Sequence, residues 1–346
     1  MNFATLQGLT IPEGVVTQIA DASGRVLWAV SGGKVILEVE KITSDTYAGE
    51  TTYTGEQFIL LDIYPKTNGT VNVTYGGLTK TITDTSGAEE PNAQRVFFGT
   101  FNGVSDSVTT PVSGELTIEG DLAGFGMCFY STGSKSLDSG YCSCIRAIIG
   151  WGKVELIPEY AFWNNSHLTN FDIPNTVKKI GYHAFSSEVE SVKIPYSVYS
   201  IEKNPFSYNL ASSVVSISEA NDAYKMIDNC LIEIATSRLI SFFADSVIIP
   251  SGVKAIGWGA ITCDSNRKSI TFPESLEHFE ESSVNFGFND GCDTVIMLSL
   301  TPPTGVGLGF ANTGDNFQVI VPKGCGDAYK AADGWNIFPD RIVEAS

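Results

Sequence analysis

Residues 171–185 have the sequence FDIPNTVKKIGYHAF, and this stretch decides the fold because it recurs along the C-terminal half of the chain. Related copies begin at Val192, Val247 and Ile270. The prolines of the first two copies lie 21 residues apart, and those of the last two lie 23 apart. A repeat period of roughly 20 to 30 residues is typical of a solenoid, in which successive coils stack on one another.

Each copy predicts a short strand followed by a turn. Phe171 and Ile173 alternate with polar residues and so face the core, while Pro174 ends the strand because it cannot donate the next ladder hydrogen bond. The chain then returns to the interior at the later apolar residues of the copy. We therefore predict one solenoid over residues 153–343. Its predicted core contains Phe162, Phe171, Ile173, Ile180, Phe185, Ile194, Ile201, Ile249 and Ile256.

The ordered pattern Ile-Pro, Val, Ile-Gly, Ala-Phe resembles the BspA-like leucine-rich repeats of bacterial and protist surface proteins. Residues 221–240 resemble the longer, hairpin-bearing repeat of that family, and residues 301–335 resemble its C-terminal cap. The resemblance implies a surface recognition module. Glu202 and Glu280 stand where Gly would follow the core residue, and Ile261 stands for Phe, so we expect irregular coils at about residues 200–215 and 261–290.

The first 30 residues predict a small β-hairpin. The β-prone runs Val15–Ile19 and Arg25–Trp28 flank turn residues in this segment. Thirty residues bury little apolar surface, so we expect the hairpin to dock on a partner.

Residues 33–125 alternate short β-prone runs with turns, including Asn68-Gly69 and Gly76-Gly77, and predict an immunoglobulin-like β-sandwich. We assign residues 126–152 to a junction and residues 153–346 to the solenoid with its cap. The predicted fold class is mainly β, with hairpin, sandwich and solenoid in that order. The predicted sandwich strands are Val35–Val39, Phe58–Ile63, Thr70–Tyr75, Thr79–Thr83, Arg95–Phe101 and Gly114–Ile118.

The composition excludes several classes of partner. The net charge is −18, from 39 acidic and 21 basic residues, and it would repel nucleic acid and anionic membranes. No apolar stretch is long enough to span a bilayer, and residues 1–30 lack the pattern of a secretory signal. The seven cysteines are scattered, which predicts buried free thiols and no metal site.

The sequence contains no recognisable catalytic constellation or cofactor motif. His167 and His183 occupy positions where we expect exposed repeat residues, and the pair Glu280-Glu281 is expected to form a solvated turn. No Gly-x-Ser-x-Gly elbow, phosphate loop or dinucleotide fingerprint occurs. We therefore predict no enzymatic activity, no cofactor and no metal, with a glycan-cleaving enzyme as the less favoured alternative.

Two sets of outward residues are candidates for binding a glycan or a protein. Outward strand positions of the solenoid form a row of mostly small and polar residues suited to hydrogen bonding. Aromatic residues in the turns suit sugar stacking or protein anchoring. The strand row contains Asn170, Asp172, Ser191, Lys193, Ser246, Ser269 and Thr271, and the aromatic set contains Trp163, Tyr182, Tyr196, Tyr199 and Trp258.

Two origins for such a binding protein stay open. Residues 9–28 are similar to the starts of gut-phage structural proteins, which favours a phage or prophage tail protein whose residues 1–125 attach to the virion. The alternative is a bacterial cell-surface adhesin whose export signal is missing from this chain. In both cases we expect the solenoid to recognise a cell-surface glycan or protein.

Overall fold

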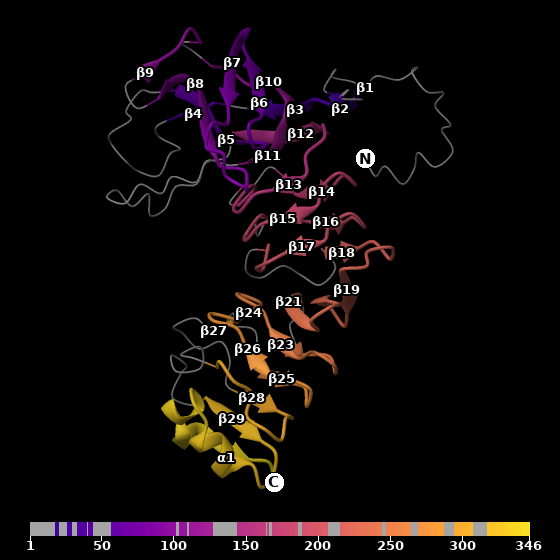
Figure 1. Ribbon diagram of the computed structural model, residues 1–346, viewed down its shortest axis with the longest axis vertical. Coiled ribbons are helices and arrows are strands. Elements are labelled where there is room, and N and C mark those ends of the chain that lie inside the picture. The colour runs from indigo at the N-terminus through magenta and orange to yellow at the C-terminus, as the bar shows by residue number, and fades with distance from the viewer. Residues whose placement is uncertain are drawn as a thin grey trace. The chain divides into compact units, whose positions relative to one another are not determined.

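A computed structural model describes the chain, and its β-strands are drawn in Figure 1. It divides into two compact units, residues 1–123 with 144–154, and residues 124–143 with 155–346. Each unit is described by itself. The described residues are 18–20, 26–29, 33–39, 41–43, 57–101, 104–108, 111–126, 144–163, 165, 168–185, 189–206, 215–243, 247–263, 269–286, 294–306 and 317–346.

The first unit is built from antiparallel strands. One five-stranded sheet has the order β12-β3-β10-β6-β7. A second group pairs β4 with β5, β5 with β8 and β8 with β9, and β1 pairs with β2. The strands are β1 (Gln18–Ala20), β2 (Val26–Ala29), β3 (Val35–Val39), β4 (Ile42–Thr43), β5 (Gln57–Pro65), β6 (Thr70–Tyr75), β7 (Leu78–Thr83), β8 (Gln94–Phe101), β9 (Val104–Ser105), β10 (Gly114–Gly120) and β12 (Ile145–Trp151).

All six strands predicted between residues 33 and 125 are present. Asn68, Gly76 and Gly77 have positive φ, as the predicted turns require. One difference concerns residues 145–151, assigned from sequence to the junction, because the backbone of β12 pairs with β3 and joins the first sheet. The immunoglobulin-like assignment itself stays a prediction.

The second unit is a solenoid of parallel strands. Each coil contributes a first strand, on the apolar-x-Ile-Pro segment, and a second strand of two residues at the Ile-Gly segment. The first strands form two sheets, β14 (Asn170–Asp172), β16 (Ser191–Ile194) and β18 (Val215–Ile217), then β22 (Val247–Ile248), β25 (Ser269–Phe272), β28 (Thr294–Met297), β29 (Gln318–Val321) and β30 (Ile342–Glu344).

The second strands also form two ladders. One ladder has the parallel order β11-β13-β15-β17, and the other has the parallel order β21-β23-β26. A third, short pairing joins β24 to β27. These strands are β11 (Leu122–Gly126), β13 (Leu156–Ile157), β15 (Lys179–Ile180), β17 (Ser200–Ile201), β21 (Arg238–Phe242), β23 (Ala255–Ile256), β24 (Ile261–Cys263), β26 (His278–Phe279) and β27 (Val284–Phe286).

The interior of the solenoid matches the prediction, since all nine predicted core residues are buried. Phenylalanines at the end of each coil stack along the unit, and the ring centroid of Phe185 lies 6.4 Å from that of Phe162 and 5.5 Å from that of Phe206. Gly181 is required beside this core because a Cβ there would lie 2.4 Å from the backbone nitrogen of Glu159. The Ile-Gly element of the repeat therefore reflects the close approach of neighbouring coils.

One coil carries an antiparallel hairpin, as the resemblance implied. It consists of β19 (Tyr224–Ile227), β20 (Cys230–Glu233) and β21, the last of which also starts the second ladder. Burial raises the pKa of the Cys230 thiol to about 12, so the thiol remains protonated. In the described part of the solenoid, no backbone pairing joins β17 to β21.

The C-terminal segment closes the last coil with short helical turns, α1 (Gly326–Ala331), η4 (Trp335–Ile337) and η5 (Pro339–Arg341). The Trp335 indole is fully buried and donates from Nε1 to the carbonyl oxygen of Pro303, 2.8 Å away. The Tyr329 hydroxyl lies 2.8 Å from the carbonyl oxygen of Ser299, and burial raises its pKa to about 12. Among the described helices, none has the length and apolar character needed to cross a membrane.

Candidate binding surfaces

The predicted strand row lies on the outer face of the first strands. Asn170, Asp172, Ser191 and Lys193 are exposed, and parallel pairing places Asn170 beside Ser191 and Asp172 beside Lys193. The Ser191 hydroxyl donates to Asn170 Oδ1 at 2.7 Å. This part of the row is therefore a polar surface whose spacing is fixed by the parallel sheet.

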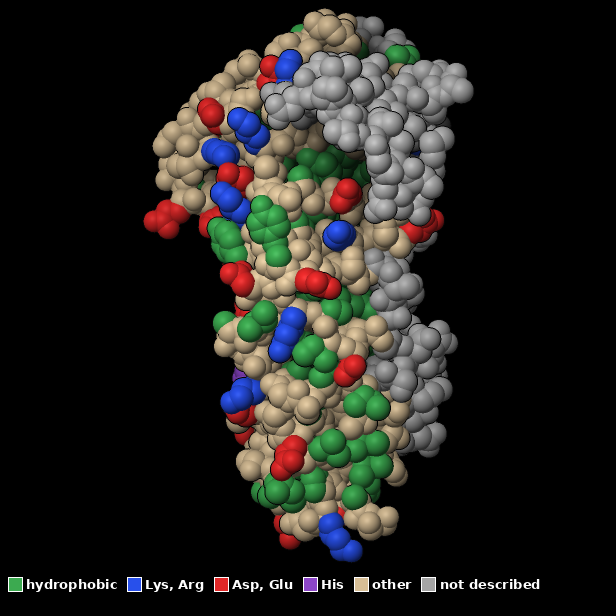
Figure 2. Space-filling view, turned by 90° about the vertical axis from the view of Figure 1, so that its right-hand side faces the viewer, with side chains coloured by type: hydrophobic (Ala, Val, Ile, Leu, Met, Phe, Trp, Pro, Cys, Tyr) green, Lys and Arg blue, Asp and Glu red, His purple; other side chains and the backbone are tan. Residues whose placement is uncertain are grey.

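The row changes character in the C-terminal sheet. Ser269 is exposed and Thr271 is half-buried, whereas Ser246 lies outside the described residues. In the parallel sheet Thr271 pairs with Ile248 on one side and with Ile296 on the other. Ile296 pairs in turn with Ile320. In Figure 2 hydrophobic side chains gather over the C-terminal coils of the face shown.

Sequence reasoning missed this apolar half of the row. The signal was present, because Ile248 and Ile320 occupy the variable position of Val-x-Ile-Pro and Val-x-Val-Pro, where Asp172 stands in the first copy. Ile248 is 66% exposed. Ile296 and Ile320 are half-buried, so this part of the row is a partly exposed apolar strip, and apolar patches of this kind contact partners.

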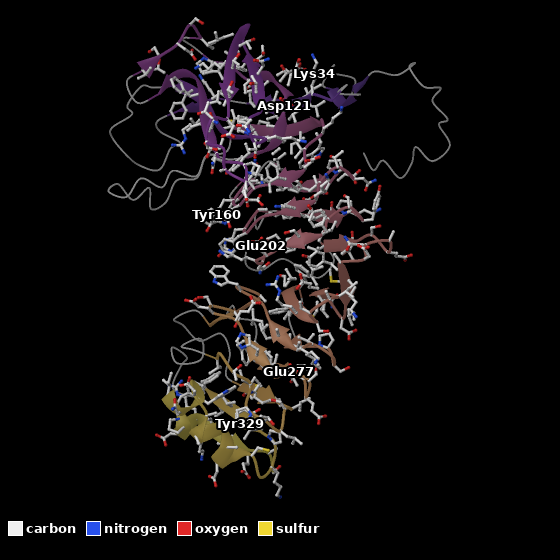
Figure 3. The ribbon with its side chains drawn as sticks, viewed as in Figure 1. Lys34, Asp121, Tyr160, Glu202, Glu277 and Tyr329 are labelled. Carbon is white, nitrogen blue, oxygen red and sulfur yellow. The ribbon has the colours of Figure 1, made fainter. Side chains whose placement is uncertain are left out.

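A second surface lies at the corner that follows the second strand of each coil. Backbone hydrogen bonds tie successive corners together, from Tyr160 N to Tyr182 O at 2.9 Å and from Asn204 N to Trp258 O at 3.3 Å. Tyr160 and Glu202 are labelled on this edge of the stack in Figure 3. Equivalent corner positions carry Glu159, Tyr182, Lys203, Trp258 and Glu281, in stack order.

Three of the five predicted aromatic residues meet at this corner. The Tyr182 and Trp258 rings meet edge to face with centroids 4.6 Å apart. Trp163 joins them through Tyr160, whose ring centroid lies 5.3 Å from that of Trp163 and 5.4 Å from that of Tyr182. We call Tyr160, Trp163, Tyr182 and Trp258 the corner cluster. All four are half-buried, so each keeps part of its surface in solvent.

The other two predicted aromatics do not join the corner cluster. Tyr196 and Tyr199 lie in the turn between β16 and β17 and are 53% and 57% exposed. The sequence identified all five as turn residues. It could not show which of them contact one another, because that depends on the corner of the coil that each turn forms.

His183 corrects an expectation, because it is buried where an exposed residue was predicted. Its backbone has φ 47°, in the left-handed region, and its ring stacks on that of Tyr182 with centroids 3.9 Å apart. Burial lowers the pKa of His183 to about 4, so its ring is neutral near pH 7. His183 therefore supports the corner cluster from beneath. His167 lies outside the described residues.

Lys203 supplies a positive charge to the corner. Its Nζ lies 5.0 Å from the centroid of the Trp258 ring and 5.8 Å from that of the Tyr182 ring, which is within the range of cation–π attraction. Exposed Glu159 and Glu281 occupy the two ends of the same row of corner positions. The corner thus combines aromatic surface with one cation and two acids.

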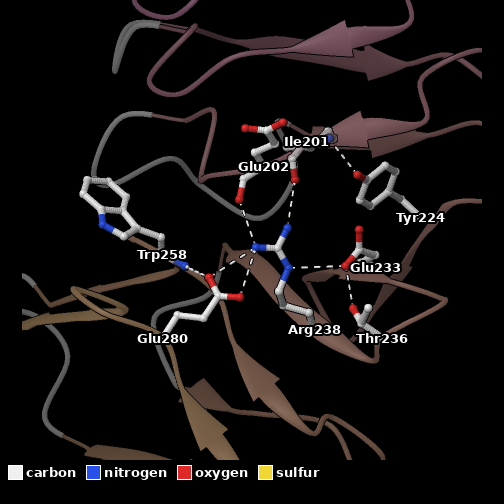
Figure 4. Close-up of polar contacts among 8 residues, drawn as sticks. All are labelled: Ile201, Glu202, Tyr224, Glu233, Thr236, Arg238, Trp258 and Glu280. Carbon is white, nitrogen blue, oxygen red and sulfur yellow. Dashed lines mark hydrogen bonds and ion pairs between the residues drawn. The ribbon is translucent and has the colours of Figure 1, made fainter. Parts of the chain in front are cut away.

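Figure 4 shows how an ion-pair network holds this corner together. Arg238 donates to the carbonyl oxygens of Ile201 and Glu202 at 3.1 and 2.9 Å, and its guanidinium also pairs with Glu280 at 3.2 Å. Glu280 in turn accepts the backbone N–H of Trp258 at 2.9 Å. The indole of Trp258 points away from this network (Figure 4).

Glu280 is therefore not part of a solvated turn, as the sequence suggested. Its carboxylate is half-buried and links two coils, although neighbouring Glu281 is exposed. No signal in the sequence pairs Glu280 with Arg238, since 42 residues separate them. Within the described residues no three His, Cys, Asp or Glu side chains are grouped so as to hold a metal ion.

Short strands, stacked turns and a shared apolar filling define a leucine-rich-repeat solenoid, a class of repeat protein. Residues 155–285 match the family described as BspA type leucine rich repeat region, in six copies. The repeat region of this chain is therefore similar to BspA-type leucine-rich repeats, as its sequence pattern indicated.

Two solved structures are similar to this chain. The first is a leucine-rich repeat protein from Eubacterium ventriosum ATCC 27560, with 17% identity, a TM-score of 0.32, and coverage of 49% of this chain and 52% of that chain. The second is the pneumococcal vaccine antigen PcpA, with 14% identity, a TM-score of 0.32, and coverage of 55% and 64%. The chain thus spans less than two thirds of either structure. No curated protein sequence matches it.

Proposed function

We propose that this chain is a non-enzymatic recognition protein whose solenoid binds a glycan or protein on a cell surface. The observation that carries the proposal is the corner cluster, where four partly exposed aromatic rings and Lys203 gather at one edge of a rigid stack. Aromatic groups with a wet edge are enriched at recognition surfaces. The exposed polar residues of β14 and β16 offer hydrogen-bonding groups on a second face.

We infer a division of labour between the two units. The solenoid presents the long, repetitive surface, while the β1–β2 pair of seven described residues is too small to hold a core of its own. In this proposal residues 1–125 attach the protein and residues 153–343 recognise the target. The attachment partner is a phage or prophage virion, or alternatively the surface of the bacterium that makes the protein.

The match of residues 155–285 to the BspA-type family supports surface binding. The virion alternative rests on the sequence pattern of residues 9–28, which resembles phage structural proteins. Gene neighbourhood distinguishes the two origins. Tail genes beside this gene would favour the virion, whereas an upstream export signal or a sorting motif would favour the bacterial surface.

The test of recognition uses the full chain with a fluorescent label on bacterial cells and on a panel of polysaccharides. We expect saturable cell binding that an unlabelled excess of the chain displaces, with no release of reducing sugar from the polysaccharides. If the chain shows saturable binding to none of the cell types, the recognition function is rejected. Polysaccharide turnover that survives repurification and disappears with one Asp or Glu substitution would favour the glycan-cleaving alternative.

A further inference from the structure

We propose that the corner cluster is a saccharide site, and that its ligand is an uncharged oligosaccharide. This inference rests on the proposed recognition function and names the ligand class of one of its surfaces. The residues assigned to contact the sugar are Tyr182, Lys203 and Trp258, with Glu159 and Glu281 at the ends of the site.

The arrangement provides both kinds of contact that a sugar ring needs. Tyr182 and Trp258 supply aromatic surface against which the C–H face of a pyranose can pack. Lys203 Nζ has three N–H donors, and carboxylates at Glu159 and Glu281 accept hydrogen bonds from hydroxyl groups.

The geometry of the stack favours a linear ligand. The corners follow one another through backbone hydrogen bonds, from His183 N to Asn204 O at 3.1 Å and from Gly259 N to Ser282 O at 3.0 Å. Neighbouring parallel segments are about 4.8 Å apart. The backbone positions that carry the contact groups therefore recur at a regular spacing along one line, which suits a chain of sugar units more than a single compact molecule.

The charges at the corner argue for an uncharged sugar. Glu159, Glu202 and Glu281 are exposed there, whereas Arg238 is already paired with Glu233 and Glu280, which leaves Lys203 as the cation among the described residues of the corner. The whole chain carries a net charge of −18, and a uronic or sialic acid would meet this excess of negative charge. A hydroxyl-bearing neutral sugar carries no such penalty.

The Arg238 network keeps the two halves of the site at a fixed distance. Arg238 binds the backbone on the Lys203 side of the corner through the Glu202 carbonyl oxygen, and it binds the Trp258 side through Glu280. Arg238 is therefore a positioning residue, because its side chain is only 14% exposed and binds the carbonyl oxygens of Ile201 and Glu202 and the carboxylate of Glu280.

The experiment is calorimetric titration of the full chain with four neutral tetrasaccharides, built from glucose in β-1,4 linkage, glucose in α-1,4 linkage, mannose and N-acetylglucosamine. Tetragalacturonate and sialyllactose serve as acidic probes. We expect at least one neutral probe to bind and the acidic probes to bind no better. Trp258→Ala and Tyr182→Ala should each weaken that binding about tenfold or more.

The matched controls are Tyr196→Ala and Tyr199→Ala, which remove exposed tyrosines outside the corner cluster and should leave the dissociation constant unchanged. Trp258→Phe, which keeps an aromatic ring, guards against misfolding of the alanine variant and should retain part of the affinity. Melting temperatures of all variants are measured alongside.

Three results would overturn the site assignment. These are no binding of any neutral probe, stronger binding of an acidic probe, or equal losses in the Tyr196 and Trp258 variants. The cell-binding assay separates such a failure from failure of the proposed function. Saturable binding of the intact chain to cells without any binding of sugars would remove the saccharide site and leave a protein partner for the recognition surface.

Discussion

The first and last strands of the solenoid share one interior pattern but differ on the outside. At the same outward position, β14, β16 and β18 carry Asp172, Lys193 and Ser216. In the C-terminal sheet β22, β28 and β29 carry isoleucine and β30 carries Val343, while β25 carries the polar residue Thr271. The inward neighbours are buried apolar residues in both regions. The repeat therefore constrains the inside of each coil and leaves the outside free to specialise along the stack.

The largest effect should come from the shared interior. Phe185→Ala and Phe279→Ala remove fully buried rings from the first and second halves of the solenoid. Each should lower the free energy of unfolding by about 3–5 kcal/mol, because a cavity remains. Urea unfolding followed by circular dichroism measures both. Unchanged stability in either variant would show that the two interiors are not equivalent.

The buried ring of His183 should make the stability of the solenoid sensitive to acid. Burial lowers the pKa of His183 to about 4, so the unfolded chain takes up its proton first, near pH 6.5. The stability that neutral His183 provides is therefore complete above pH 6.5 and is lost as the pH falls toward 4, by about 3 kcal/mol at most.

The corresponding variant is His183→Asn. It should flatten the fall in melting temperature between pH 6.5 and 4, since Asn does not titrate and tolerates positive φ. An identical pH profile for wild type and His183→Asn would contradict the burial of this ring.

Ion pairs inside and outside the stack should also differ. Arg238→Ala removes a network of low exposure and leaves Glu280 and two backbone carbonyls without their partner, at a cost of about 2 kcal/mol. The comparison is Lys254→Ala, which breaks an exposed pair with Glu277 and should cost less than about 0.5 kcal/mol. Equal losses in chemical denaturation would argue against the linking role of Arg238.

The smallest effect is expected on the outer row itself. Lys193→Thr and Ile248→Thr place threonine on the outer row of the N-terminal and C-terminal sheets, as at Thr271. Each should change the free energy of unfolding by less than about 0.5 kcal/mol. Thermal unfolding of the two variants measures this. A large destabilisation by Ile248→Thr would mean that the apolar side of the row is part of the core.

The sequence was sufficient for the interior of the solenoid, because each buried position obeys a spacing that local chemistry imposes. Pro174 ends a strand and Gly181 permits close approach wherever they occur. The corner cluster could not be predicted in the same way. Trp258 and Tyr182 come from different coils, with the coil of Lys203 and the hairpin between them in the sequence, and no residue at either position indicates that their rings meet.

The predicted exposure was also wrong for two residues that lie outside the conserved pattern of the repeat and contact residues from elsewhere in the chain. His183 has the sequence context of a variable residue, yet a left-handed backbone turns its ring inward under Tyr182. Glu280 was expected in solvent, but Arg238 arrives from the hairpin to meet it. Both cases depend on contacts between segments that no local pattern records.

The inserted hairpin also affects how the stack should come apart. Both strand ladders are interrupted at its level in the described residues, after β17 in one sheet and after β18 in the other. The described contacts across this level include the corner hydrogen bond from Asn204 to Trp258, the edge-to-face rings of Phe206 and Phe243, and side-chain bonds to Ile201.

The Tyr224 hydroxyl accepts a hydrogen bond from the N–H of Ile201 at 2.6 Å, and Arg238 donates to the carbonyl oxygen of Ile201. Side chains therefore bind the backbone of β17 where a neighbouring strand would otherwise pair with it. In a linear array the cooperativity of unfolding depends on the coupling between nearest neighbours. A joint held by side chains couples its neighbours more weakly than a continuous backbone ladder does. Native-state hydrogen exchange should therefore resolve two cooperative blocks that meet at Ile201, with Arg238 setting how strongly the opening of one block is transmitted to the other.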